Sequence, residues 1–388
     1  MFQTLLLEYD STISVETVIA HFALQKENAK HNLETLMSKK ISYKNYCVLI
    51  RYLSFYAPSV ALELLKSKQL KEPYFYLSLL AHLGKHAELE KEIKSQLNAD
   101  SSSEVLLLKN YLHNDAKQKI IQLNTLFKEN ELELLQLKDK NKNLFVDNLY
   151  STATPLPKED MPLVSIIVTT YNLEKYIEHS IKSLLNQTYT NIEIIVVDDA
   201  SSDNTVAIVD KIALKHTNIK LIKQTNNVGT YACKHIAMEY VNGEFVQCHD
   251  GDDWACPQKI EKQVIPLLKD RKLVATFSRW LRLDKDGDPV TDRIYPLIRE
   301  NPSSCLFRKE VVMNKMRLWE QVKTGADSEF NARIKQIFSK QILTIKLPLT
   351  IGSYRKESLS QNPNTKDPLG RLKYWEEWKK NLIKKRII

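Results

Sequence analysis

The chain has 388 residues, of which 43% are hydrophobic and 27% are charged, and its formal net charge is +9. The length exceeds the usual size of one domain, and the composition is that of a folded globular protein, which excludes collagen-like and extended flexible classes. The positive charge favours an acidic partner. Nucleic acid, an anionic membrane and a phosphorylated substrate all fit it.

The cysteines and the first ten residues indicate the cellular compartment in which we expect the protein to act. The five cysteines are scattered and include no Cys-x-x-Cys pair, which predicts neither a zinc site nor a disulfide framework and favours a reducing cytoplasm. The start, MFQTLLLEYD, has no basic leader and is a poor signal peptide. No stretch approaches the roughly 18–20 uncharged apolar residues of a spanning helix, so we expect any membrane association to be peripheral.

Residues 12–148 have a helical pattern. Apolar residues recur at three- and four-residue steps, as in Val48, Leu49, Tyr52, Leu53 and Tyr56. The units between short breakers resemble helix-hairpin repeats of the tetratricopeptide type. They show no fixed period, however, and a generic helical bundle is an equally good interpretation. We expect residues 1–150 to form a helical domain used for packing or docking.

A loop rich in Ser, Thr and Pro covers residues 151–161, and we expect it to be a linker. After this loop the helical pattern gives way to alternating strands and helices. Predicted strands cover residues 163–169, 192–197, 219–223 and 244–248. Predicted helices cover residues 173–185, 205–214 and 231–241. This alternation predicts an α/β domain over residues 162–360, with an open, mostly parallel sheet covered on both faces.

Polar clusters follow the predicted strands. Ligands of such sheets gather beyond the carboxyl ends of the strands, so we expect these loops to share one rim. In the first two loops, Tyr171 and Asp199 suit a pyrimidine base, because the ring stacks and the carboxylate accepts an N–H of the base. The alternative is that Asp199 and Ser201 only form a turn and cap a helix.

Three carboxylates lie close together in the run HDGDDW, residues 249–254. Asp250, Asp252 and Asp253 repel one another unless a cation lies among them, and oxygen-liganded Mg²⁺ or Mn²⁺ fits, bridging the protein to a diphosphate. The alternatives are a solvated acidic turn and the two-metal site of a nucleic-acid polymerase.

Asp327 lies at the start of a helix predicted to run to about residue 337. A carboxylate on that first turn is suited to act as general base toward an acceptor hydroxyl. The alternative is that acidic residues simply favour helix N-termini because of the helix macrodipole.

The order of these motifs carries more information than any one of them. The runs LVSIIVTTYN, IEIIVVDDASSDNT, NNVGTYACKH, FVQCHDGDDW and TGADSEFNARI occur in the order found in inverting family 2 glycosyltransferases with the GT-A fold, which this chain resembles over roughly residues 161–360. The resemblance implies a nucleotide-sugar donor, a Mn²⁺ or Mg²⁺ cofactor, and a role in bacterial surface polysaccharide synthesis. It also implies a glycan or lipid-linked glycan as the acceptor.

The resemblance implies a role for each matched residue. The nucleotide-sugar-binding positions are Thr169, Tyr171, Asn172, Asp199, Lys234, Asp250, Asp253 and Arg355. The metal positions are Asp250 and Asp252, and the catalytic base is Asp327, with Glu329 as a nearby substitute. Lys234 is a departure, because the family usually has Ala-Arg-Asn where this chain has Cys-Lys-His. Lysine keeps the charge but loses the two-pronged geometry of arginine.

The tail, residues 361–388, predicts a basic amphipathic helix with Leu372, Trp375, Trp378 and Leu382 on one face. Such a helix favours an anionic leaflet, here the cytoplasmic face of the membrane, although a terminal helix packed on the domain fits as well.

Three other functions fit parts of the sequence. A nucleotidyltransferase usually has a Gly-rich basic loop after the first strand, where this chain has residues 169–172, TTYN. A non-catalytic scaffold acting through the helical domain is opposed by the intact aspartates. Nucleic-acid binding is the weakest, because the basic residues are dispersed.

Overall fold

The computed structural model describes residues 14–39, 41–68, 72–96, 102–157 and 161–359, together with positions 361, 374, 377, 378 and 380. The chain divides into two compact units. One is Met1–Leu112 with Val290–Leu297, and the other is His113–Pro289 with Ile298–Ile388. Most of the tail predicted to form an amphipathic helix lies outside the described residues.

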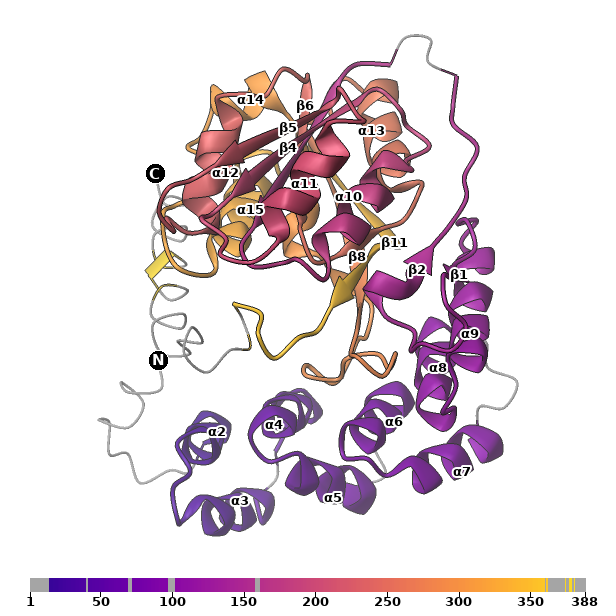
Figure 1. The fold of residues 1–388 in the computed structure, drawn as a ribbon. Helices are drawn as coiled ribbons and strands as arrows, with labels where there is room; N and C mark the ends of the chain where they lie inside the picture. Colours follow the sequence, from indigo (N-terminus) through magenta and orange to yellow (C-terminus); the bar gives the residue numbers. More distant parts are fainter. Residues whose placement is uncertain are drawn as a thin grey trace. The chain divides into compact units, whose positions relative to one another are not determined.

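The first unit is helical, as the sequence predicts. Its helices are α2 (Val15–Ala23), α3 (Ala29–Met37), α4 (Tyr43–Tyr56), α5 (Pro58–Lys68), α6 (Pro73–His82), α7 (His86–Gln96), α8 (Ser103–Leu108) and the 3₁₀ helix η1 (Lys109–Leu112) (Figure 1). The side chains of Ser14 and Ser42 cap α2 and α4 by accepting backbone N–H bonds. Leucines at helical spacing on α4, Leu49 and Leu53, are fully buried.

A short segment from the middle of the chain completes this helical unit. In residues 290–297, the hydroxyl of Thr291 lies 3.2 Å from Nδ1 of His82, and the ring of Tyr295 stacks on Tyr74 with centroids 6.3 Å apart. This insertion lies between β8 (Ala275–Leu283) and β9 (Arg299–Glu300) in the sequence.

The second unit begins before the predicted linker. It contains α9 (Ala116–Glu129), β1 (Gln136–Leu137), η2 (Val146–Asn148) and β2 (Leu149–Tyr150). The continuous helical pattern therefore ends at Glu129 rather than near residue 148. Within this unit, the ammonium of buried Lys119 of α9 lies 2.7 Å from Oδ1 of Asp288. The predicted domain bounds at 150 and 161 stay a prediction.

The second unit is built on a mixed sheet. Its further strands are β3 (Val164–Thr170), β4 (Ile192–Asp198), β5 (Ile219–Lys223), β6 (Phe245–Asp250), β7 (Trp254–Ala255), β10 (Leu306–Arg308) and β11 (Ile342–Ser353). The order is β5-β4-β3-β6-β10-β8-β11-β7, with β9 on β8. The pairs β3–β4, β3–β6, β4–β5 and β8–β11 are parallel, whereas β7, β9 and β10 pair antiparallel. The predicted α/β class of GT-A type is confirmed.

Helices cover both faces of this sheet. They are α10 (Ile177–Leu185), α11 (Thr205–Ala213), α12 (Thr230–Met238), α13 (Lys259–Lys269), α14 (Lys309–Met313) and α15 (Ala326–Ile337), with the 3₁₀ helix η3 (Pro302–Ser304) (Figure 1). Side chains alternate along a strand, so Ile166 and Val168 of β3 pack in a core with α10, α11 and α13, whereas Ile167 packs in a core with α12 and α15. Burial on both faces explains the uninterrupted apolar runs of the strands.

Strand register brings the polar loops to one rim. Thr169 of β3 pairs with Val197 of β4 on one side and with Asp250 of β6 on the other. The three parallel strands therefore end together, and the loops that follow them meet at the same edge. Among the helices that the described residues form, none has the length and apolar character needed to cross a bilayer.

Candidate active site

Asn172 joins the first two loops of the rim. Its backbone takes a left-handed conformation (φ 51°), which asparagine tolerates better than most residues. Its N–H donates to the hydroxyl of Ser201 over 2.9 Å, and its Oδ1 accepts the N–H of Ser202 over 2.8 Å. Tyr171, next to it, is 49% exposed at the rim. The ring that sequence analysis assigns to base stacking is therefore open to a ligand.

Asp199 joins the second loop to the third. Its buried carboxylate accepts the backbone N–H groups of Val228 over 2.7 Å and of Gly229 over 2.9 Å. The neighbouring hydroxyls of Thr169 and Thr230 lie 2.7 Å apart. Asp199 thus has a structural role in shaping the loop. A carboxylate oxygen accepts more than one hydrogen bond, so a contact with a base N–H is compatible with this arrangement.

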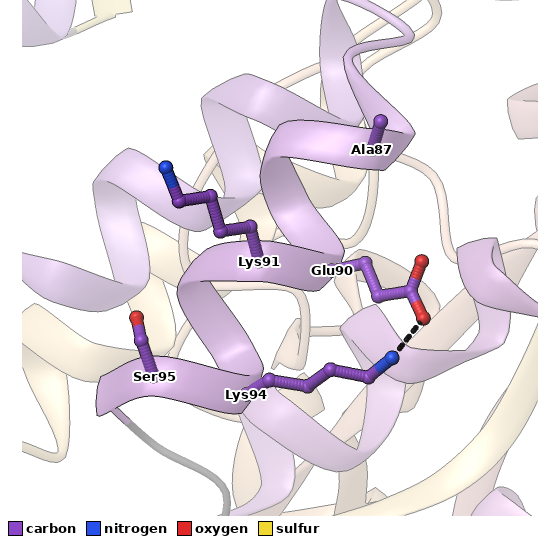
Figure 2. Close-up of a pocket in the computed structure, with 5 residues that line it drawn as sticks. All are labelled: Ala87, Glu90, Lys91, Lys94 and Ser95. Carbon is purple, nitrogen blue, oxygen red and sulfur yellow. Dashed lines mark hydrogen bonds and ion pairs between the residues drawn. The ribbon is translucent and has the colours of Figure 1, made fainter.

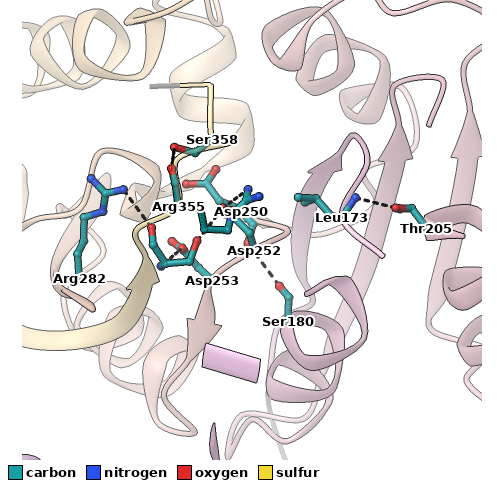
Figure 3. A network of polar contacts seen from close by, with 10 residues as sticks. Leu173, Ser180, Thr205, Asp250, Asp252, Asp253, Arg282, Arg355 and Ser358 are labelled. Carbon is teal, nitrogen blue, oxygen red and sulfur yellow. Dashed lines mark hydrogen bonds and ion pairs between the residues drawn. The ribbon is translucent and has the colours of Figure 1, made fainter. Parts of the chain in front are cut away.

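The three aspartates after β6 point in different directions (Figure 3). Oδ2 of Asp250 accepts the hydroxyl of Ser303 over 2.8 Å. Oδ2 of Asp252 accepts the hydroxyl of Ser353 over 2.8 Å. Oδ1 of Asp253 accepts the N–H of Ser353 over 2.9 Å. Only the first two carboxylates therefore remain candidates to face a ligand, and Asp253 holds β11 against the loop.

Arg355 covers the acidic loop. Its Nε and Nη2 donate to Oδ2 of Asp252 over 2.9 and 2.6 Å, and its guanidinium lies 4.8 Å from the centroid of the Tyr176 ring. The hydroxyl of Ser358 donates to the Arg355 carbonyl over 2.8 Å, as Figure 3 shows. Arg355, which is predicted to bind the diphosphate, therefore forms an ion pair in this structure with Asp252, a predicted metal ligand.

Crowding of charge perturbs this loop. Burial raises the pKa of Asp250, Lys234 opposes the shift, and Asp327 and Asp252 add to it. Burial raises the pKa of Asp253 well above its usual range, and the charges of Asp252 and Asp250 act in the same direction. Such carboxylates favour a nearby cation.

The donor set fits a hard divalent cation with few protein ligands. Within the described residues, no group of three or more His, Cys, Asp and Glu side chains converges to hold a metal ion. Mg²⁺ commonly takes one or two carboxylates and completes its shell with water and substrate phosphates. Asp250 and Asp252 are the two carboxylates that the sequence predicts for this role.

A buried lysine behind the loop was missed in the sequence analysis. Lys259 is fully buried, and its Nζ lies 2.9 Å from Nδ1 of His249, whose Nε2 lies 3.2 Å from the carbonyl of Asp253. Burial lowers the pKa of Lys259 to about 8, and Asp253 and Asp250 oppose that shift. In the sequence, Lys259 is simply a charged residue at the start of an amphipathic segment, which forms α13.

Asp327 lies on the first turn of α15 and has a single close cationic partner in Lys234 of α12. Their side chains are 16% and 3% exposed, and Lys234 Nζ lies 2.6 Å from Asp327 Oδ1. Glu329 is buried and paired with Arg333, with Nη2 to Oε2 at 2.7 Å. The substitute base is therefore already committed to a structural ion pair, whereas Asp327 retains partial exposure.

Surface hollows lie elsewhere. One is lined by Ala87, Glu90, Lys91, Lys94 and Ser95, all from α7, where Lys94 and Glu90 form an ion pair of 2.5 Å (Figure 2). A second is lined by residues of α9 and by Leu134. Neither contains a residue of the rim, and the first is the side of one helix, so neither competes as a candidate active site.

Comparisons with known proteins agree with the motifs. Residues 165–332 match the sequence model described as Glycosyl transferase family 2. An uncharacterized glycosyltransferase of Haemophilus influenzae is 37% identical over 131 residues, covering 34% of this chain and 52% of that protein. The chondroitin synthase of Escherichia coli is 29% identical over 174 residues, covering 44% of this chain and 25% of that protein. The matches span about half or less of these relatives.

Solved structures are similar at a lower level. The structure of S. aureus TarS 1–349 in complex with UDP-GlcNAc has a TM-score of 0.43 and 24% sequence identity, covering 51% of this chain and 60% of that chain. The sequence match alone therefore assigns the family. Over residues 165–332, the chain belongs to glycosyltransferase family 2.

Proposed function

We propose that this chain is an enzyme that transfers a sugar from a nucleotide-diphosphate sugar to a hydroxyl acceptor by one inverting displacement. The observation that carries the proposal is the pairing of a two-carboxylate cation site, Asp250 and Asp252, with a partly exposed carboxylate, Asp327, within one family 2 domain. The charge of Asp327 acts on the pKa of Asp250, so the two lie within electrostatic reach.

The donor is expected to lie along the rim. Tyr171 is exposed for stacking on a pyrimidine base, with Asp199, Thr169 and Asn172 beside it, which favours a UDP-linked sugar. The diphosphate would extend toward Asp250 and Arg355, whereas Asp253, also predicted to bind the donor, is held by the backbone of Ser353. These assignments rest on the resemblance and on the loop contacts described above.

The chemical step balances as a single substitution. Asp327 takes the proton of the acceptor hydroxyl, and the acceptor oxygen forms a bond to the anomeric carbon. The bond from that carbon to the diphosphate oxygen breaks, and its electron pair leaves with the nucleoside diphosphate. One attack from the opposite side inverts the anomeric centre, so an α-linked donor gives a β-linkage. When bound at Asp250 and Asp252, Mn²⁺ or Mg²⁺ would stabilise the charge of the leaving group.

The biological product we propose is a bacterial surface polysaccharide, built on a glycan or lipid-linked glycan acceptor. Relatives with partial coverage include the hyaluronan synthase of Pasteurella multocida and a putative teichuronic acid biosynthesis glycosyltransferase of Bacillus subtilis. A cytoplasmic enzyme with a basic tail at the membrane face suits such an acceptor, and nucleic acid is not the expected partner.

A donor screen tests this function. The full chain is incubated with a panel of nucleotide sugars, with and without glycan acceptors, in Mn²⁺ or Mg²⁺, and released nucleoside diphosphate is measured. We expect release with a uridine diphosphate sugar, abolished in Asp250→Asn. Asp210→Asn is the control, because its ion pair with Lys223 is about half exposed and contributes little.

The alternatives predict different outcomes in the same screen. Binding of nucleotide without release by any donor and acceptor pair would favour the non-catalytic scaffold. Release of inorganic pyrophosphate from a nucleoside triphosphate and a sugar phosphate would favour a nucleotidyltransferase.

A further inference from the structure

Lys234, which the sequence predicts to bind the donor, instead contacts Asp327, the proposed general base. Its side chain is 3% exposed, and Nζ lies 2.6 Å from Oδ1 of Asp327. The rings of Tyr231 and Trp319 flank the ammonium, with their centroids 5.3 and 5.4 Å away. Aromatic faces stabilise a desolvated cation, so the site accommodates a permanent charge.

The charges around Lys234 keep it protonated. Burial by itself lowers the pKa of Lys234, but Asp327, Cys248, Asp250 and Tyr231 act against burial and leave the pKa above its usual value. The ammonium of Lys234 is therefore a permanent positive charge that acts on both Asp327, the proposed general base, and Asp250. Asp250 experiences the same charge, because Lys234 opposes the upward shift of its pKa.

The backbone around the base is held by the same helix. The N–H of Gly325, the residue before α15, donates to the hydroxyl of Tyr231 over 3.1 Å, and Gly325 has a left-handed conformation (φ 97°). Tyr231 and Lys234 of α12 thus hold both the start of α15 and the carboxylate on its first turn. These two contacts from α12 therefore restrict the direction of the Asp327 side chain.

We propose that Lys234 is a positioning residue for the general base: its buried ammonium holds the Asp327 carboxylate in one direction, and so affects the rate of the chemical step rather than the affinity for the donor. The inference rests on the proposed glycosyl transfer. It departs from the sequence-based assignment of Lys234 to donor binding.

The physical argument concerns orientation. The ammonium of Lys234 lies 2.6 Å from Oδ1 of Asp327 and restricts the rotation of that carboxylate. A carboxylate without its partner rotates more freely, and misplacement of a reacting group by about 1 Å costs as much as 10²-fold in rate. Loss of Lys234 removes this restriction.

The test compares Lys234→Met with Lys234→Arg in the full chain. Lys234→Met is expected to lower kcat by about 10–100-fold, within the range of a misplaced catalytic group, with the Kd for UDP and Mn²⁺ changed less than about threefold. Lys234→Arg retains a cationic donor beside Asp327 and should recover part of the kcat that Lys234→Met loses.

The chain contains a matched control. Lys119 and Asp288 form a pair of 2.7 Å with side chains 5% and 16% exposed, almost the same as the 3% and 16% of Lys234 and Asp327. Lys119→Met therefore removes an equally buried ammonium from the same unit, away from the rim. We expect a loss of thermal stability, with kcat per folded molecule unchanged.

A double variant tests whether Lys234 acts through Asp327. Lys234→Met combined with Asp327→Asn should be no slower than Asp327→Asn alone, because the base is already absent. The double variant leaves no unpaired buried charge, so this comparison also serves if Lys234→Met does not fold. A double variant that is further slowed, or that loses UDP binding, would overturn the inference.

The remaining outcomes separate this inference from the proposed function. If Asp327→Asn keeps its activity, the proposed mechanism itself fails. If Asp327→Asn is inactive but Lys234→Met keeps the wild-type kcat, only the positioning role is wrong. Weakened UDP binding with unchanged kcat would return Lys234 to the donor site.

Discussion

Replacement of Asp327 by asparagine is expected to have two separable effects. Asparagine keeps the size and the helix-start polarity but does not accept the acceptor proton, so turnover should fall by about 10²–10⁴-fold. It also leaves the ammonium of Lys234 unpaired, in a side chain that is 3% exposed. Breaking a buried ion pair from one side costs about 3–5 kcal/mol, well above the roughly 0.3–1 kcal/mol expected if Asp327 only complements the helix macrodipole.

The two effects need two assays. Thermal unfolding should show Tm lowered by roughly 6–20 °C, since about 1 kcal/mol shifts the Tm of a domain of this size by about 2–4 °C. Nucleoside diphosphate release is then measured well below that Tm, per folded molecule. Asp288→Asn is the control, because it removes the ion-pair partner of buried Lys119, which keeps its bond to the Asp286 carbonyl, and should lower Tm without lowering turnover.

Glu329→Gln decides between the two candidate bases. Glu329 is buried in its pair with Arg333, so its replacement should lower stability and leave turnover per folded molecule near the wild-type value. If Asp327→Asn transfers sugar at the wild-type rate while Glu329→Gln does not, Glu329 is the base. If both variants remain active, the inverting mechanism on α15 is refuted.

Three further predictions concern the metal loop and the units. Asp252→Ala removes a predicted metal ligand and the partner of Arg355, and calorimetry should show strongly weakened UDP binding in Mn²⁺; unchanged affinity would remove Asp252 from the metal site. A chain that begins at His113, the start of the second unit, should still bind UDP in the same assay. If this shortened chain folds but does not bind UDP, the donor site does not lie in the second unit alone. Burial raises the pKa of Asp250 and Asp253, so these two groups bind more protons in the native state than in the unfolded chain. Their contribution to the free energy of unfolding should therefore fall as pH rises from the usual aspartate range through the raised pKa values, and Mn²⁺ should oppose this fall; thermal unfolding across pH with and without Mn²⁺ tests both signs.

Local pattern was sufficient to predict the strands that carry the site. The predicted strand over residues 219–223 is the observed β5, and the predicted strands over 163–169 and 192–197 differ from β3 and β4 by one residue at their ends. A short, uninterrupted apolar run is typical of a strand that is buried on both faces of a parallel sheet, and parallel strands end at a common edge. The sequence alone therefore predicted that the loops carrying Tyr171, Asp199 and Asp250 share one rim.

The sequence by itself determined the family, the α/β class and which loops meet, because these depend on short-range periodicity and on motif order. Only the tertiary structure decided which side chains pair. Lys234 reaches Asp327 across 93 positions, and Arg355 reaches Asp252 across 103. Lys119 reaches Asp288 across 169 positions, and the second unit includes α9 from the expected helical domain. Such pairs depend on how α12, α15 and β11 pack, and local propensity carries no information about that packing.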